Sequence, residues 1–176
     1  MTRMTPKIGI ILGSASDAPH AQKVASVLRE IGVGFEVTVA SAHRTPDDTS
    51  AYARSARGRG LSVIIAVAGL SAALPGAVAA CTTLPVIGLP VESGTLLGLD
   101  ALLSSSMMPP GVPVATVGIN ADANAALLAA RIAGVNDAKI ARALEAYAAA
   151  RAEKVRASRS PQVLGDLPIA PADALR

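Results

Sequence analysis

Aromatic side chains are nearly absent from this chain of 176 residues, where they make up 2% and tryptophan does not occur. The core must therefore be packed with Ala, Val, Leu and Ile, whose small size lets helices and strands approach closely. The formal charge is only +3, and the Lys and Arg residues are scattered. Proteins that bind nucleic acid gather basic residues in one patch, often with aromatic residues between them, so we expect no nucleic-acid partner.

Cysteine and long apolar runs are also scarce. Cys81 is the only cysteine, which excludes an internal disulfide framework and a metal site built from several cysteines. No apolar run free of glycine and proline is long enough to span a bilayer, and the N-terminus lacks the cleavage pattern of a secretory signal. We therefore expect a soluble protein of the reducing cytoplasm, without a membrane partner.

Hydrophobic residues are abundant instead, at 51% against 16% charged. Five short runs of apolar, largely β-branched residues recur at 7–12, 35–40, 62–68, 85–91 and 112–119. Nearly continuous apolar runs are typical of strands buried on both faces of a parallel sheet. Helical patterns follow them at 17–32, 45–60, 72–81, 94–107 and 121–133. The alternation predicts an α/β protein: a three-layer, flavodoxin-like or Rossmann-like sandwich with a parallel five-stranded sheet.

The length predicts a single domain, which we place at residues 1–158. After Gly134 the chain is rich in alanine and charge, which predicts an extra C-terminal helix that packs on a neighbouring subunit. The remaining residues, 159–176, contain three prolines and no periodicity, so we expect an extended arm or a disordered tail.

The residues directly after each apolar run are the first candidates for a site, because ligands bind beyond the carboxyl ends of parallel strands. The sequence GSASD follows the first run, and its Gly13 permits a tight turn. Ser14, Ser16 and the free N–H groups of a following helix suit a phosphate, and Asp17 suits ribose hydroxyls. Plain capping of the helix by Ser16 or Asp17 explains the same residues equally well.

The sequence SAHRTPDD follows the second run. Arg44 can bind phosphate oxygens with two N–H groups, Ser41 can assist it, and the imidazole of His43 can exchange a proton near neutral pH. Thr45 is expected to cap the next helix, with Asp48 three residues later completing a variant of the capping box. We therefore expect Ser41, His43 and Arg44 to share one edge of the sheet with GSASD.

Two further loops leave their roles open. After the third run, Gly69 and Ser71 suit either close packing or a binding role. In residues 89–117 the Gly and Pro loops and the triple serine at 104–106 could line a pocket or a subunit contact, and Asp100 needs a partner if it is buried. His20 lies within the first predicted helix and is interpreted as a surface or packing residue.

Taken together, these motifs resemble the PurE family, and within it the 5-(carboxyamino)imidazole ribonucleotide mutases of purine biosynthesis. The resemblance runs from about Ile8 to Gly134 through GSASD, SAHRTPD, AGLSAALPG, LPVIGLPVES, GLDALLSSSMMPPGVPVATVGIN and NAALLAARI. It implies a small-molecule ribonucleotide as ligand, no ATP, biotin, metal or other cofactor, and a homo-octamer. It implies that His43 is the general acid/base, and that the phosphate and ribose are bound by Ser14, Asp17 and Arg44 with help from Ser16 and Ser41.

The chain departs from the family pattern at two places. Where the family reads GGAAHLPG, this chain has Leu70, Ser71 and Ala73 in place of glycine, alanine and histidine, and Met107 stands where glutamine is usual. These changes keep two alternatives to the mutase open: a diverged enzyme that carboxylates, decarboxylates or rearranges another nucleotide, and a catalytically silent nucleotide-binding protein.

Overall fold

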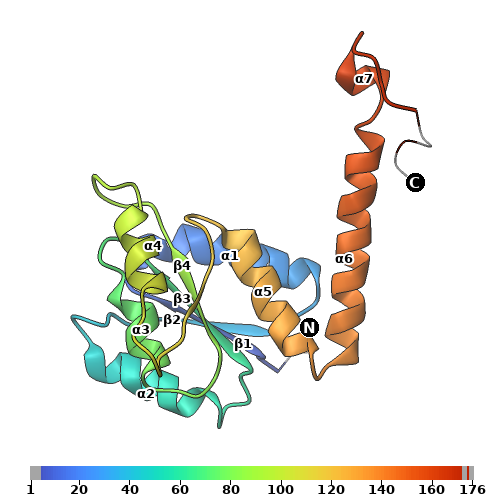
Figure 1. Ribbon diagram of the computed structural model, residues 1–176. Coiled ribbons are helices and arrows are strands. Elements are labelled where there is room, and N and C mark those ends of the chain that lie inside the picture. The colour runs from blue at the N-terminus through green and yellow to red at the C-terminus, as the bar shows by residue number, and fades with distance from the viewer. Residues whose placement is uncertain (1–4, 172–173, 175–176) are drawn as a thin grey trace.

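The computed structural model describes residues 5–171 and 174, and it shows a parallel five-stranded sheet with helices on both faces (Figure 1). The strands are β1 (Ile8–Leu12), β2 (Phe35–Val39), β3 (Val63–Ala68), β4 (Val86–Pro90) and β5 (Ala115–Thr116). Their order is β2-β1-β3-β4-β5 and every neighbouring pair is parallel. The predicted α/β class and the flavodoxin-like strand order are confirmed.

Seven helices and one short 3-10 turn connect and follow the strands within the described residues. They are η1 (Ala15–Asp17), α1 (Ala18–Glu30), α2 (Pro46–Ala56), α3 (Ala73–Ala79), α4 (Leu99–Ser106), α5 (Asp122–Gly134), α6 (Ala138–Ala157) and α7 (Pro161–Leu164). Residues of α1 and α5 share one hydrophobic core with one face of the sheet, and residues of α2, α3 and α4 share a second core with the other face. Both faces of the central strands are therefore covered.

Small side chains make this double cover possible, as the composition predicts. On α5, Ala125, Ala126, Ala129 and Ala130 are fully buried against the sheet and α1. Because an alanine face adds little thickness, helix and sheet approach closely and the strand residues fill the space between them. The strands β1, β3 and β4 are buried at every position.

Two predicted strands differ from the structure. β2 is an edge strand, and its Val37 and Val39 remain 48% and 55% exposed, so the prediction of burial on both faces is wrong for this strand. The run at 112–119 contributes only the two residues of β5 to the sheet. Tertiary position, which the apolar pattern does not report, decides both cases.

The start of α4 also has a clear physical cause. The helix predicted from residue 94 begins only at Leu99, because Leu97 and Gly98 have φ angles of 51° and 87°, which a right-handed helix cannot contain.

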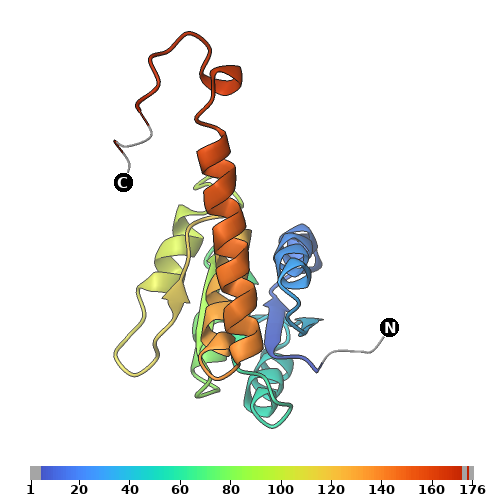
Figure 2. The same ribbon diagram turned by 90° about the vertical axis from the view of Figure 1, so that its right-hand side faces the viewer.

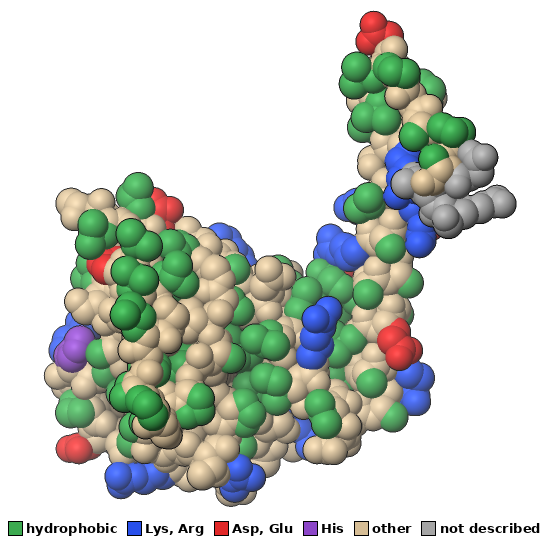
Figure 3. Space-filling view, viewed as in Figure 1, with side chains coloured by type: hydrophobic (Ala, Val, Ile, Leu, Met, Phe, Trp, Pro, Cys, Tyr) green, Lys and Arg blue, Asp and Glu red, His purple; other side chains and the backbone are tan. Residues whose placement is uncertain are grey.

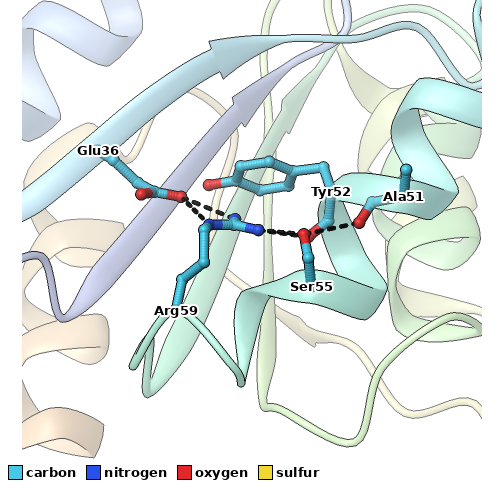
Figure 4. Close-up of polar contacts among 5 residues, drawn as sticks. All are labelled: Glu36, Ala51, Tyr52, Ser55 and Arg59. Carbon is cyan, nitrogen blue, oxygen red and sulfur yellow. Dashed lines mark hydrogen bonds and ion pairs between the residues drawn. The ribbon is translucent and has the colours of Figure 1, made fainter.

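The turn after α2 is held to β2 by Arg59, whose guanidinium lies 2.8 Å from the Glu36 carboxylate and above the Tyr52 ring (Figure 4).

The last long helix, α6, extends away from the sheet and carries the C-terminal residues at its far end (Figures 1 and 2). Its only buried residue is Ile140, so most of its surface is free in a single chain. In the tail, which we predicted to be extended or disordered, the structure has one helical turn at Pro161–Leu164. None of the helices in the described part of the chain combines the length and the apolarity that crossing a membrane requires.

Candidate functional site

A cavity of about 600 Å³ opens at the carboxyl ends of the central strands. The strand order reverses there, since β1 is followed on one side by β2 and on the other by β3. The ends of four strands and the segments after them form the cavity walls: residues 13, 14, 16 and 17 follow β1, 41–44 follow β2, 68 ends β3 and 69–74 follow it, and Ser93 follows β4. The cavity thus occupies the place where flavodoxin-like folds bind their ligands.

All of the predicted site residues line this one cavity: Ser14, Ser16, Asp17, Ser41, His43, Arg44, Gly69 and Ser71. Their roles in binding and proton transfer remain predictions, whereas their common location is observed. His20, which was not predicted for the site, does not line it.

The GSASD loop forms a self-bonded turn at the start of α1. The Ser14 hydroxyl accepts hydrogen bonds from the Ser16 amide at 3.3 Å and from the Ser16 hydroxyl at 2.9 Å. The Asp17 carboxylate accepts from the Ser14 amide at 3.0 Å. Ser14 and Asp17 thus form a capping box on η1, and Asp17 is also the N-cap residue of α1, although its side chain makes no capping hydrogen bond to that helix. Of the two residues in the alternative interpretation, Asp17 stands at a cap and Ser16 does not, and capping coexists with the proposed binding role.

Asp17 is 8% exposed at the edge of the cavity. Burial raises the pKa of its carboxyl above the ordinary value, and the Ser14 amide and the nearby His20 oppose part of that rise. The carboxylate is therefore held in a place that favours its neutral form, which is common for a group kept for binding or chemistry.

Arg44 connects the second loop to the first. Its Nη2 donates to the Gly13 carbonyl oxygen at 3.2 Å, and the Ser41 hydroxyl accepts from its backbone amide at 3.2 Å. No carboxylate of residues 5–171 or 174 forms an ion pair with Arg44. The guanidinium is thus oriented by neutral acceptors and keeps its charge available for an anion.

The capping box predicted at Thr45 is wrong. The Thr45 hydroxyl accepts from the Ser41 amide at 2.9 Å, and α2 begins at Pro46 without a side-chain cap. The hydroxyl closes the loop that carries His43 instead of the helix end. His43 is exposed, lines the cavity and has no side-chain hydrogen-bond partner in the described part of the chain.

The third loop is bent by unusual backbone angles. Leu70 and Ala72 have φ angles of 50° and 27°, values that side-chain-bearing residues rarely adopt. A Cβ on Gly69 would lie 2.9 Å from the Cβ of Ser93, so close packing between the loops after β3 and β4 requires glycine there. The Leu70 side chain is 55% exposed at the rim, and Ala73 lines the cavity where the family pattern has histidine.

Residues 89–117 meet the first of the two options that the sequence left open, through the loop after β4 and not through the triple serine. Ser93 lines the cavity, and its position shortly after β4 is the signal that could have identified it. Within the triple serine, Ser105 is fully buried and donates to the Ala101 carbonyl oxygen, so it stabilises α4. Asp100 is half-buried and accepts from the Ala101 amide. In the described ranges no cluster of three His, Cys, Asp or Glu side chains could hold a metal ion.

The fold and the cavity define a class: a doubly wound α/β protein with serine hydroxyls, an unpaired arginine and an imidazole at the switch point of its sheet. Comparison with known proteins gives the family. The family described as AIR carboxylase matches residues 7–154, and the chain belongs to this family, which confirms the predicted PurE resemblance.

Relatives and solved structures agree with this assignment. The N5-carboxyaminoimidazole ribonucleotide mutase of Thermotoga maritima is 54% identical over 142 residues, covering 81% of this chain and 83% of that protein. The protein of the same name from Methanocaldococcus jannaschii is 52% identical over 151 residues, covering 86% and 94%. The crystal structure of Treponema denticola PurE is similar with a TM-score of 0.79 and 34% identity, covering 87% of this chain and 96% of that one.

Proposed function

We propose that this protein is a 5-(carboxyamino)imidazole ribonucleotide mutase of purine biosynthesis. The reaction moves a carboxylate from the exocyclic nitrogen of the substrate to ring carbon 4. The observation that carries the proposal is the meeting of Arg44, Asp17 and His43 in one cavity at the switch point, in a chain that is 54% identical to a mutase.

The anionic end of the substrate fits the polar side of the cavity. Ser14, Ser16, Ser41 and Arg44 offer hydroxyl and guanidinium N–H donors to a phosphate, and the N-terminus of α1 lies beside them. Asp17 offers carboxylate oxygens to the ribose hydroxyls. The loops after β1 and β2 therefore bind the part of the substrate that does not react.

The reacting end meets the apolar side. The bond between the exocyclic nitrogen and the carboxylate breaks and releases carbon dioxide, and the nitrogen takes up a proton. Carbon 4 then attacks the carbon dioxide and loses its own proton, so the reaction consumes none overall. His43 is positioned to give the proton to the nitrogen and to take the proton from carbon 4. The walls formed by Ala68, Ala72 and Leu74 keep carbon dioxide near the ring.

The changes from the family's GGAAHLPG to GLSAALPG favour one of the two alternatives, the diverged enzyme. Ala73 brings no imidazole, so His43 is the only histidine among the cavity-lining residues. A diverged enzyme that acts on another nucleotide would explain the change. Restoring histidine with Ala73→His separates the two: a large gain in mutase turnover indicates a weakened mutase, and no gain indicates a different reaction.

Exposed apolar side chains support self-association, and from the family resemblance we propose an octamer. The loop before α4 and α4 itself carry Leu96, Leu97, Leu99, Leu103 and Met107, each 46–77% exposed (Figure 3). Burial of this surface against other copies would explain why a chain with so few charges exposes it. The proposed location is the cytoplasm, and the proposed partner is the ribonucleotide.

The test of the function is turnover of the carbamate substrate without ATP. His43→Asn should lower kcat by at least about a hundredfold, because it removes general acid/base catalysis. Arg44→Met should raise KM, and Arg54→Met, which removes an exposed arginine of α2 outside the cavity, is the matched control. Ribonucleotide binding that depends on Arg44 but yields no product would instead identify a silent binding protein.

A further inference from the structure

Two side chains of α1 form ion pairs with one carboxylate of α5. The His20 Nδ1 lies 2.8 Å from the Asp122 Oδ1, and the Lys23 Nζ lies 3.5 Å from the Asp122 Oδ2. His20 belongs to the first turn of α1, and Asp122 is the first residue of α5. The pair spans 102 residues of sequence and connects the two helices at their N-terminal ends.

The carboxylate in this contact is buried, and its two donors differ in exposure and in distance. Asp122 is 6% exposed, whereas the side chains of His20 and Lys23 are 19% and 64% exposed. A buried carboxylate is costly unless a donor compensates it, and the N-terminus of α5 supplies only part of that compensation. His20 is the close donor, and Lys23 is a distant and largely solvated one.

The rest of the packing between α1 and α5 is apolar and has no directional contact of this kind. Ala21, Val24, Ala125 and Ala129 meet in one core cluster, and alanine surfaces allow small shifts at little cost. The hydrogen bond of 2.8 Å between His20 and Asp122 is directional, so it fixes the position of α1 relative to α5, which the alanine contacts leave free to shift. The N-terminal end of α1 is therefore located by the His20–Asp122 pair.

The turn at that end of α1 forms one wall of the cavity. Asp17 lies three residues before His20, which places both on the same side of the chain at the helix start, and Asp17 closes the turn by accepting from the Ser14 amide. The opposite wall is formed by Arg44, which reaches across to the Gly13 carbonyl oxygen. A shift of α1 along α5 would change the separation between the hydroxyls of the turn and the guanidinium.

We propose that His20 and Asp122 are positioning residues that hold the Ser14–Asp17 turn at the correct distance from Arg44 and so set the affinity for the ribonucleotide. The inference rests on the proposed function for the identity of the ligand. His20 takes no part in proton transfer, because it does not line the cavity.

The experiment compares His20→Ala with His20→Gln, whose amide N–H can still donate to Asp122. His20→Ala should raise KM about tenfold with kcat within about twofold, since the substrate is held less accurately but reacts by the same groups. His20→Gln should restore KM to within about threefold of the original protein. Gln22→Ala, which shortens an exposed side chain of the same helix, is the matched control and should leave both constants unchanged.

An unchanged KM in His20→Ala would overturn the proposal, whether or not kcat falls. If His20→Ala fails to fold because Asp122 is left uncompensated, the double variant His20→Ala/Asp122→Asn removes the buried charge and decides instead. A raised KM in the folded double variant supports the positioning role, and the original KM contradicts it.

Calorimetry separates this proposal from the proposed function. With aminoimidazole ribonucleotide as the probe, weaker binding by His20→Ala supports positioning even if the protein converts no carbamate substrate. Binding that is lost in Arg44→Met but unchanged in His20→Ala would leave the ribonucleotide site in place and overturn the positioning role.

Discussion

At the scale of the residue, Asp17 illustrates a site that works against stability. Burial raises the pKa of its carboxyl, so the folded protein holds the proton more tightly than the unfolded chain. The stabilising contribution of Asp17 is therefore fully present below the unfolded pKa and is lost as the pH rises through the folded pKa.

Replacing this carboxylate by a neutral group of the same shape should stabilise the protein and damage binding. We expect Asp17→Asn to raise the free energy of unfolding at neutral pH by about 0.5–1 kcal/mol and to lose the gain near pH 4. Affinity for the ribonucleotide should fall about tenfold or more, because Asp17 no longer offers two acceptor oxygens. Urea denaturation at both pH values and calorimetry measure the two effects.

The control is Asp47→Asn, which changes an exposed carboxylate in the first turn of α2 and should give no gain in stability. A loss of stability in Asp17→Asn at neutral pH would show that the hydrogen bond from the Ser14 amide outweighs the cost of burial.

At the scale of the element, the packing of α2 on β1 depends on one close approach. A Cβ on Gly9 would lie 2.5 Å from the Tyr52 hydroxyl, which is buried and has no hydrogen-bond partner within the described ranges. Burial, followed by the nearby Glu36, raises the pKa of Tyr52, so the hydroxyl stays neutral. Arg59 covers the ring, with its charge centre 4.6 Å from the ring centroid (Figure 4).

A double-mutant cycle should measure this approach. Gly9→Ala should cost about 1–3 kcal/mol, because the new methyl group overlaps Tyr52. Tyr52→Phe should add up to about 1 kcal/mol by removing an unpaired hydroxyl, and in that background Gly9→Ala should cost less. Additive free energies of unfolding in urea would show that the methyl group is accommodated elsewhere, for example by movement of Leu61.

At the scale of the whole molecule, the apolar surface around α4 should decide the assembly. Leu97 and Met107 are 62% and 77% exposed, and a lysine at both positions would have to be desolvated in any contact that covers them. We expect Leu97→Lys/Met107→Lys to reduce the mass measured by light scattering to that of one chain, 17.6 kDa. Turnover should fall with the mass.

Val163→Lys is the control for added charge, because Val163 is also 62% exposed but lies in the tail, away from α4. If the unmodified protein already has the mass of one chain, the proposed octamer is contradicted. An assembly that survives the double lysine variant would place the contact on another surface.

Much of the fold was predictable because the strands and helices of an α/β sheet leave separate periodic patterns in the sequence. The location of Ser14, Ser41 and Arg44 was predictable for a related reason, since the carboxyl ends of parallel strands share one edge. Local pattern could not show that the Thr45 hydroxyl would close a loop instead of capping a helix. Nor could it show that β5 would contribute only two residues to the sheet.

The sequence by itself determined the class of fold, the family and the common edge of the sheet at which the predicted site residues lie, because each depends on short motifs and local periodicity. Only the tertiary structure decided that His20 pairs with Asp122 and that β2 leaves Val37 and Val39 exposed. These features arise where segments distant in sequence meet. The free energy of such a contact depends on three-dimensional distance and on burial, which neither residue encodes alone.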